Sequence, residues 1–581
     1  MASVDSRHRP NDVDRGRSSR GLAVVAAVAG LSVLTVIAVR AVAADAKGCG
    51  SGVRLTVAAA PEIAPAVQKI AATWVATNPR VGNQCVSVQV SPMSPADVAG
   101  VLAARSGGRI NTGGQAVAAA NTPPPTDTQV PAAWVPDSTS WLGRVQAINR
   151  DAFDPEYFSL AMSPVVLAGP EPVVRSLQNG KPRKLAIPDL ARMLDRVLRG
   201  GDKTVRIAMV EPRRDAAGLA GAVLLHDAVV NTPAQLPVLV GTYRSVVLAP
   251  DQASLLKGFE TTQAVAPMSE QAMLAYDAAA PKVPLSAITL EPTVALDYPY
   301  AVVTGKPRAI TQAAELFRGA LNGPEVRELL AKAGFRAQDG TAETGFPAGH
   351  GASTEPIVGM PLDDPAKIAE VVGIWTASKT PSRVLALVDV TASMNNPITM
   401  PSGAQVTRMQ VMQQAAVDGL RLFTDDSEVG IWAYALSLAP NRDHREVVPI
   451  AELNRAQRAR LNAAIAAVQP APTDVAGLYD SLLAAYQEMK DGYRVDRSNT
   501  IVVFTDGRNS KPGGTTLDGL QLGLEKLADL TKPIRVVLLG IGPDVDLTEL
   551  ETIAKATGGK AFQVSDPAKI GSIFLNALLR P

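Results

Sequence analysis

The segment Leu385–Met394, which reads LALVDVTASM, constrains the fold of this chain more than any other stretch. An apolar run leads into Asp389, and Thr391 and Ser393 follow at two-residue spacing. One carboxylate and two hydroxyls on a short turn are the hard oxygen ligands that Mg²⁺ prefers. Capping of the following helix by Thr or Ser would explain the hydroxyls without any metal. We therefore predict a strand that ends at a candidate metal site.

The sequence around this segment alternates between apolar runs and helix-like stretches. The runs Arg383–Val388, Thr500–Phe504 and Ile534–Gly540 are typical of buried parallel strands. We expect helices at Val406–Phe423, Ala451–Val468, Leu478–Lys490 and Leu517–Leu527. Alternation of this kind predicts an open α/β sheet with helices on both faces. Such sheets place their ligands outside the carboxyl ends of the strands.

A second carboxylate stands at one of these strand ends. Asp506 follows Thr500–Phe504 in the string VVFTDG, and Gly507 supplies the turn that returns the chain to a helix. The combination of DVTAS with FTDG resembles the von Willebrand factor type A (VWA) domain and its metal-ion-dependent adhesion site (MIDAS). The resemblance implies a doubly wound, Rossmann-like domain over residues 364–581.

The resemblance also implies a site chemistry. In the VWA family, two hydroxyls and a loop threonine hold the ion, carboxylates often act through water, and an acidic residue of a partner protein completes the shell. Carried over to this chain, the implied ligands are Asp389, Thr391, Ser393 and Asp506, and the expected ion is Mg²⁺, or Mn²⁺ or Ca²⁺. The loop threonine is open, because Ala476 stands at its expected position and Thr473 lies three residues upstream. We include Thr473 as a candidate, and a domain that keeps the fold but binds no ion is the alternative.

Nearly three hundred residues before this domain follow a different pattern. Val53–Ala58 predicts a strand, Ile63–Ala76 a helix and Val86–Val90 a second strand. Followed by AAWVPDSTSW, AMSPVVLAGP, LDYPYAVVTG and ELFRGALNGPEVRELLAKAGFR, this opening resembles the type 2 solute-binding proteins of bacterial uptake systems. The resemblance implies a two-lobed, periplasmic-binding-protein-like α/β domain over residues 48–340, with a ligand cleft where loops at strand ends converge.

Candidate cleft residues follow the predicted strands, although capping and turn formation explain each of them equally well. They are Pro61, Glu62, Ser91, Met93, Ser138, Thr139, Arg213 and Asp215. The string VEPRRDAAGLAG resembles the strand-to-helix turn of the family, where backbone N–H groups can hold an anion. The ligand itself is unknown from the sequence. Residues 341–363, which contain Gly and Pro, predict a linker between the two domains.

The N-terminus predicts a membrane anchor. Gly21–Val39 is an uncharged run of 19 residues, long enough to span a bilayer as a helix. Arginines within residues 1–20 favour a cytoplasmic tail and an extracytoplasmic position for the rest of the chain. A cleaved signal peptide is the alternative, because residues 41–43 (AVA) resemble a small-residue cleavage site.

Cysteine, charge and histidine usage narrow the function. Cys49 and Cys85 are the only cysteines, and oxidising conditions outside the membrane permit a disulfide between them, with two buried free thiols as the alternative. A net charge of +1 without a basic stripe argues against a nucleic-acid partner. The four histidines are isolated from one another, and neither HExxH nor GxSxG is present, so we expect no enzyme and no catalytic residue.

Two functions remain. The first is an anchored extracytoplasmic adhesion protein, in which the metal site captures an acidic group of a protein partner. The second is a solute receptor, in which the middle domain binds a small molecule and the VWA-like domain relays its occupancy. The sequence contains no identifiable ligand selector, so we favour the first.

Overall fold

The computed structural model describes residues 52–110, 112, 129–178, 184–186, 189, 192, 205–230, 236–399, 403–421, 423–507, 511–529, 531–543 and 545–564. The predicted tail (1–20), the predicted membrane helix (21–39) and Cys49 lie outside these residues. Within them, every helix is too short or too polar to cross a membrane. Cys85 takes part in a disulfide, and its predicted pairing with Cys49 stays a prediction.

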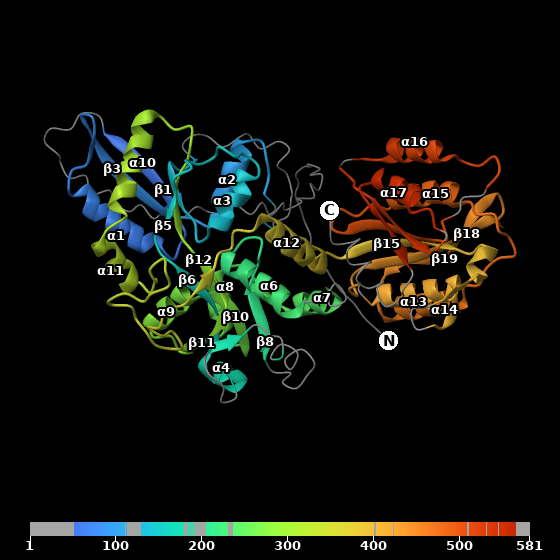
Figure 1. The fold of residues 1–581 in the computed structure, drawn as a ribbon, viewed down its shortest axis with the longest axis horizontal. Helices are drawn as coiled ribbons and strands as arrows, with labels where there is room; N and C mark the ends of the chain where they lie inside the picture. The colour runs from blue at the N-terminus through green and yellow to red at the C-terminus, as the bar shows by residue number, and fades with distance from the viewer. Residues whose placement is uncertain are drawn as a thin grey trace, which may run out of the picture. The chain divides into compact units, whose positions relative to one another are not determined.

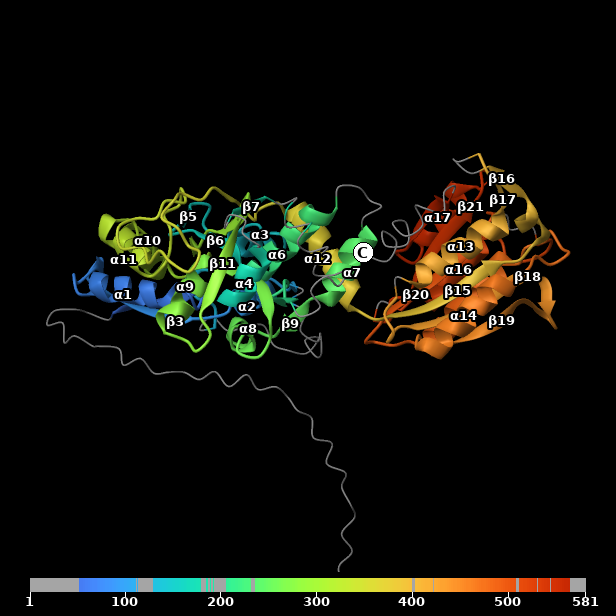
Figure 2. The same cartoon turned by 90° about the horizontal axis from the view of Figure 1, so that it is seen from below.

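The first lobe of the N-terminal domain is a six-stranded sheet with helices packed against it (Figure 1). In sheet order its strands are β2 (Arg80–Val81), β3 (Gln84–Pro92), β1 (Val53–Ala59), β4 (Ala133–Val135), β13 (Pro299–Val302) and β5 (Phe158–Ser159). Its helices are α1 (Ala64–Val75), α2 (Pro95–Arg105), α3 (Thr139–Gln146), α10 (Arg308–Ala320) and α11 (Pro324–Lys332), and α1 lies against α10 and α11 in Figure 2. The predicted opening of strand, helix and strand is confirmed as β1, α1 and β3. Because β1 pairs in parallel with both β3 and β4, the carboxyl ends of these strands meet at one edge.

The second lobe is an eight-stranded sheet. Six strands follow the order β14 (Gly359–Met360), β12 (Thr293–Leu296), β6 (Ser163–Pro170), β10 (Ala264–Ser269), β8 (Arg206–Val210) and β9 (Val247–Ala249). The others are β11 (Leu285–Glu291), which pairs with β6, and β7 (Lys184–Ala186), which pairs with β11. The helices are α4 (Glu171–Gln178), α6 (Ala216–Val229), α7 (Leu236–Ser245), α8 (Gln252–Gly258) and α9 (Glu270–Ala278). The chain crosses between the sheets from β5 to β6 and back from β12 to β13, so the predicted two-lobed α/β architecture is confirmed.

The structure differs from the predicted linker at residues 341–363. Arg336 is fully buried, pairs with Glu270 at 2.6 Å, and donates to the carbonyls of Ser353 at 2.6 Å and Glu355 at 2.9 Å. The strand β14 then adds to β12 in the second lobe. A buried guanidinium needs several acceptors, and these carbonyls supply them. The segment is therefore packed against the second lobe.

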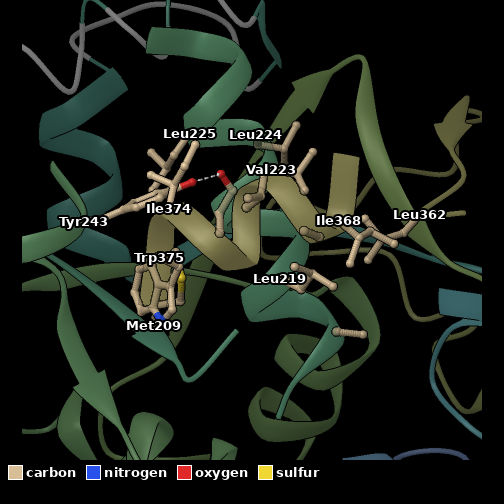
Figure 3. Close-up of a cluster of buried hydrophobic side chains, with 14 of the residues drawn as sticks. Met209, Leu219, Val223, Leu224, Leu225, Tyr243, Leu362, Ile368, Ile374 and Trp375 are labelled. Carbon is tan, nitrogen blue, oxygen red and sulfur yellow. Dashed lines mark hydrogen bonds between the residues drawn. The ribbon is translucent and has the colours of Figure 1, made fainter. Parts of the chain in front are cut away.

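The helix α12 (Pro365–Lys379), which the sequence assigned to the C-terminal domain, also packs against α6 and α7. Figure 3 shows Ile374 and Trp375 among the buried side chains of these helices. The Trp375 and Tyr243 rings meet edge to face at 5.0 Å, and the Trp375 indole donates to Glu211 at 2.9 Å. Burial of an aromatic ring of this size is a large apolar contribution, so α12 belongs structurally to the second lobe.

The C-terminal domain is a second six-stranded sheet, mostly parallel, with helices on both faces (Figure 1). Its strands, in sheet order, are β19 (Arg442–Glu452), β18 (Glu428–Ala439), β15 (Ser382–Asp389), β20 (Ser498–Thr505), β21 (Arg535–Ile541) and β22 (Lys560–Val564). Its helices are α13 (Arg408–Leu420), α14 (Arg455–Ala467), α15 (Leu478–Asp491), α16 (Leu517–Leu527) and α17 (Leu547–Lys555). The three predicted strands are confirmed as β15, β20 and β21, and the four predicted helices as α13 to α16.

The central strand β15 shows why this sequence folds as a doubly wound sheet. Its residues alternate between the two faces: Val384 and Val388 belong to one apolar cluster, and Leu385 and Leu387 belong to another. A strand that is covered by helices on both faces needs apolar residues at consecutive positions. The run ends at Asp389, where the sheet ends and the polar loop begins.

Candidate metal centre

The loop that follows β15 brings three predicted side chains together. The Asp389 Oδ1 atom accepts hydrogen bonds from the Thr391 N–H at 2.9 Å and from the Thr391 hydroxyl at 2.6 Å. The Thr391 and Ser393 hydroxyl oxygens lie 2.8 Å apart. A short helical turn, η2 (Ala392–Asn395), follows and fixes this spacing. The two-residue spacing in the sequence therefore becomes one cluster of three oxygens.

The loop between α14 and α15 lies against this cluster. The Ala392 N–H donates to the Thr473 carbonyl at 2.8 Å, and the Thr473 hydroxyl accepts from the Val475 N–H at 3.2 Å. Ala476 is buried and packs in the apolar cluster with Leu478. The backbone of Thr473 thus lies next to the Asp389 loop, and its hydroxyl as a ligand of the ion stays a prediction.

The second carboxylate comes from the neighbouring strand. β20 pairs in parallel with β15, with Val388 opposite Phe504, so Asp506 and Asp389 leave the sheet at the same edge. Both side chains are almost fully buried. Burial, followed by the negative charge of Asp506, raises the pKa of Asp389 to about 6. The two carboxylates therefore face a shared site.

Two residues of this site were missed by the sequence analysis. Arg408, the first residue of α13, donates through Nη1 to Asp506 Oδ2 at 3.0 Å. Tyr434 on β18 stands opposite Asp389 in the sheet register and donates its hydroxyl to Asp389 Oδ2 at 3.0 Å. Thr407 and Gln410 form a capping box that marks the start of α13, where Arg408 lies. This Thr-x-x-Gln pattern could have been read from the sequence. Nothing in the apolar run of β18 indicated the role of Tyr434.

The donor set fits a hard divalent cation. Its atoms are carboxylate and hydroxyl oxygens, which Mg²⁺ and its relatives prefer over nitrogen and sulfur ligands. Asp389 and Asp506 supply two negative charges, and Arg408 offsets one of them. The described residues contain no group of three or more His, Cys, Asp or Glu side chains that could hold a metal ion, so this site relies on hydroxyl oxygens beside its two carboxylates.

Comparison with known proteins agrees with this geometry. Residues 55–336 match the family of bacterial extracellular solute-binding proteins, and residues 384–576 match the von Willebrand factor type A domain. The chain joins a solute-binding domain to a VWA domain.

Individual relatives are distant. Rv1836c, an uncharacterised protein of Mycobacterium tuberculosis, is 28% identical over 547 residues, covering 87% of this chain and 73% of that protein. A solved periplasmic thiamin binding protein is 13% identical with a TM-score of 0.38, covering 57% of this chain and 98% of its own. A VWA protein from Catenulispora acidiphila is 19% identical with a TM-score of 0.28, covering 34% of this chain and only 42% of its own. At TM-scores this low, the two structures carry no argument about function.

Candidates in the solute-binding domain lie at the loops that the sequence predicted, and several make local hydrogen bonds. Ser138 caps α3 by accepting from the Ser140 N–H at 3.1 Å. The Thr139 N–H donates to the Asp297 carboxylate at 2.7 Å. The candidates near the carboxyl ends of β1 and β3 are Pro61, Glu62, Ser91 and Met93.

The candidates after β8 belong to the start of α6. Asp215 caps this helix, and its carboxylate accepts from the Gly218 N–H at 2.6 Å. Arg213 pairs with Glu211 at 2.7 Å, and both side chains are largely buried. Capping and pairing thus account for part of what these residues do.

Proposed function

We propose that the VWA domain binds Mg²⁺, or a related divalent ion, and uses it to capture an acidic group of a protein partner. The proposed ligands are Asp389, Thr391, Ser393, Thr473 and Asp506. The observation that carries this proposal is the chain of contacts from Asp389 Oδ1 through the Thr391 hydroxyl to the Ser393 hydroxyl. Beside it lies the buried Asp506.

The surrounding residues hold the carboxylates ready for an ion. The Tyr434 hydroxyl and the Thr505 hydroxyl both donate to Asp389 Oδ2, at 3.0 and 3.4 Å. Arg408 holds Asp506 in the same way. Because neither carboxylate has to reorient, little ordering entropy opposes binding. A bound Mg²⁺ supplies a positive charge with a coordination place that a carboxylate oxygen of the partner can take.

We also propose the cellular setting that the sequence favours. Residues 21–39 anchor the chain in the cell membrane, the N-terminal tail lies in the cytoplasm, and both domains lie outside. In this setting the chain is a binding protein without catalytic activity. The support is the uncharged run and the arginines before it.

Calorimetric titration of the full chain in detergent with Mg²⁺ tests the metal site. We expect Asp389→Ala to abolish the binding heat, because it removes the carboxylate to which both hydroxyl contacts lead. Asp425→Ala is the matched control, since this exposed carboxylate of the same domain pairs only at the surface with Arg458, and it should bind as the unchanged chain does. Unchanged Mg²⁺ binding by Asp389→Ala would refute the proposal.

Partner capture needs a separate readout. Once a protein partner is identified, its binding to the full chain should require Mg²⁺. The binding should be lost in EDTA and in the Asp389→Ala variant. Metal-dependent capture that survives this substitution would place the adhesion site elsewhere.

A second candidate function is solute capture by the middle domain, with the VWA domain relaying occupancy. The observation that favours it is a pair of buried polar atoms of the solute-binding domain, Asp137 Oδ1 and the Tyr298 hydroxyl, that have no hydrogen-bond partner. Native proteins rarely leave such atoms unsatisfied, so a ligand is one way to complete them. A thermal-shift screen of small molecules on the full chain tests this function.

A further inference from the structure

Three carboxyl groups of the solute-binding domain lie in separate loops, and two of them follow the neighbouring strands β1 and β4. Glu62 follows β1, Asp137 follows β4, and Asp215 caps α6 in the second lobe. Burial, followed by the charges of Glu62 and Asp215, raises the pKa of Asp137 well above its usual range. Burial raises the pKa of Glu62 to about 7, and the charge of Asp215 contributes to this rise. Each group is therefore close enough to feel the charge of another.

An anionic ligand at the start of α6 would meet carboxylates of the chain itself. The Asp215 carboxylate accepts from the Gly218 N–H at 2.6 Å, and the backbone N–H groups of Ala217 and Ala216 act against the rise in pKa of Asp215 and Asp137. These are the N–H groups with which a helix N-terminus would bind an oxyanion. The family resemblance implied that backbone N–H groups at this turn can hold an anion, and in the structure the Asp215 carboxylate accepts from one of them, the Gly218 N–H.

Polar atoms remain unsatisfied beside these carboxylates. Asp137 is 3% exposed and Tyr298 is fully buried, yet Asp137 Oδ1 and the Tyr298 hydroxyl have no hydrogen-bond partner. The charges of Glu62 and Asp137 both act on the Tyr298 hydroxyl, so the unpartnered atoms belong to the same cluster. An unpaired buried carboxylate oxygen is costly. A ligand that donates hydrogen bonds would satisfy it.

The positive charge at this cluster is too small to balance the carboxyl groups. The charge of Arg144 acts on Asp137, but its guanidinium also lies over the Trp141 ring at 4.3 Å and donates to the Arg213 carbonyl at 3.2 Å. Three ionised carboxylates against one guanidinium would leave two negative charges.

We propose that the cleft of the solute-binding domain binds a small organic cation with N–H donors, such as an amine or a guanidinium, and excludes oxyanions. Glu62 and Asp137 are its counter-ions. The Tyr298 hydroxyl is a further polar contact. This inference rests on the second candidate function and is independent of the metal centre.

Calorimetry and thermal shift of the full chain in detergent, with EDTA present, test the inference. The probes are agmatine and putrescine as N–H cations, tetramethylammonium as a cation without N–H groups, and sulfate and phosphate as oxyanions. We expect agmatine or putrescine to bind and raise the Tm, and the other three probes to have no effect. Binding by sulfate or phosphate instead would refute the inference while leaving the receptor function standing. If no probe binds at about 1 mM, the inference fails, and the receptor function is decided by the wider small-molecule screen.

Matched variants locate the site. We expect Glu62→Gln and Asp137→Asn each to weaken cation binding by about tenfold or more, because each removes a charge-assisted hydrogen bond. Tyr298→Phe should weaken it by a few-fold, about the value of one neutral hydrogen bond. Glu156→Gln is the control, since that exposed carboxylate pairs with Arg318 at the surface of the same domain. Asp425→Ala at the surface of the VWA domain should also leave cation binding unchanged, and equal affinity in the Glu62 and control variants would overturn the assignment.

Discussion

The metal centre of the VWA domain and the cleft of the solute-binding domain are built at equivalent places. In both, carboxylates stand where parallel strands of an α/β sheet end. In the metal centre, Asp389 and Asp506 lie beside two hydroxyls, and Tyr434 and Arg408 hold their second oxygens. The neutral oxygens and fixed carboxylates suit a hard metal ion.

The cleft surrounds its carboxylates differently. The Asp215 carboxylate accepts from the Gly218 N–H at the start of α6, and one carboxylate oxygen of Asp137 is left without a partner. A carboxylate competes with an oxyanion for backbone donors, and an unpaired carboxylate oxygen requires a donor. The comparison shows that the strand end supplies the position of a site, while the neighbouring groups select its ligand.

Removing the fixed positive charge of the metal centre should have the largest effect on stability. Arg408→Gln leaves Asp506 buried without its ion-pair partner, so the metal-free VWA domain should lose about 3 kcal/mol of unfolding free energy. A bound Mg²⁺ should offset much of this loss, because it supplies the missing positive charge. Urea unfolding with EDTA and with Mg²⁺ measures both values.

The control for this substitution is Arg421→Gln. Arg421 pairs with Asp418 at the exposed surface of α13, and its loss should cost less than about 1 kcal/mol. An equal loss for Arg408→Gln with and without Mg²⁺ would show that Arg408 does not lie in the electrostatic field of a bound ion.

The pH dependence of stability tests whether the carboxyl groups of the solute-binding domain are buried. Burial raises the pKa of Glu62 to about 7 and that of Asp215 to about 6. The folded cleft therefore binds more protons than the unfolded chain, and its stability falls as the pH rises from about 4.5 to 7, by on the order of 2 kcal/mol. Arg144, Tyr298 and Asp137 face these groups.

Thermal unfolding of the ligand-free chain between these pH values measures the effect. In Glu62→Gln the decline should become smaller, because that side chain no longer ionises. Agmatine should bind more tightly as the pH rises through the same interval, since it favours the ionised carboxyl groups. A stability that rises over this interval in the unchanged chain, and is unaffected by Glu62→Gln, would contradict the burial of this charge.

The smallest expected effect concerns the open ligand of the metal centre. If the Thr473 hydroxyl contacts the ion, Thr473→Ala should weaken Mg²⁺ binding by about tenfold. Thr531→Ala, a threonine in an exposed turn of the same domain, should have no effect. Calorimetry measures both, and identical affinities for the two variants would remove Thr473 from the ligand set.

Part of each site could be predicted from the sequence because it depends on local spacing. Asp389, Thr391 and Ser393 fall within five residues, and the strand before them is readable from its apolar run. Asp506 was also within reach, because a parallel sheet brings its strand ends to one edge. Arg408 and Tyr434 were not, because 98 and 45 residues separate them from the carboxylates that they contact.

The helix α12 illustrates the same limit on a larger scale. Its residues predict a helix wherever it packs, and Asp364 with Pro365 marks its start. The sequence placed it with the C-terminal domain because it directly precedes β15. Contacts of Trp375 and Ile374 with α6 and α7 place it in the second lobe instead.

Two α/β domains, the strands that end at each site, and the oxygen atoms available for a metal ion could all be read from the sequence. Hydrophobic periodicity and side-chain spacing are local, so they can be read along the chain. The pairing of Arg408 with Asp506 and the charges that act on Asp137 become visible only in the folded chain. Charge pairing and burial depend on groups that sheet register and helix packing bring together. Because these groups come from distant segments, no single segment reveals how close they lie.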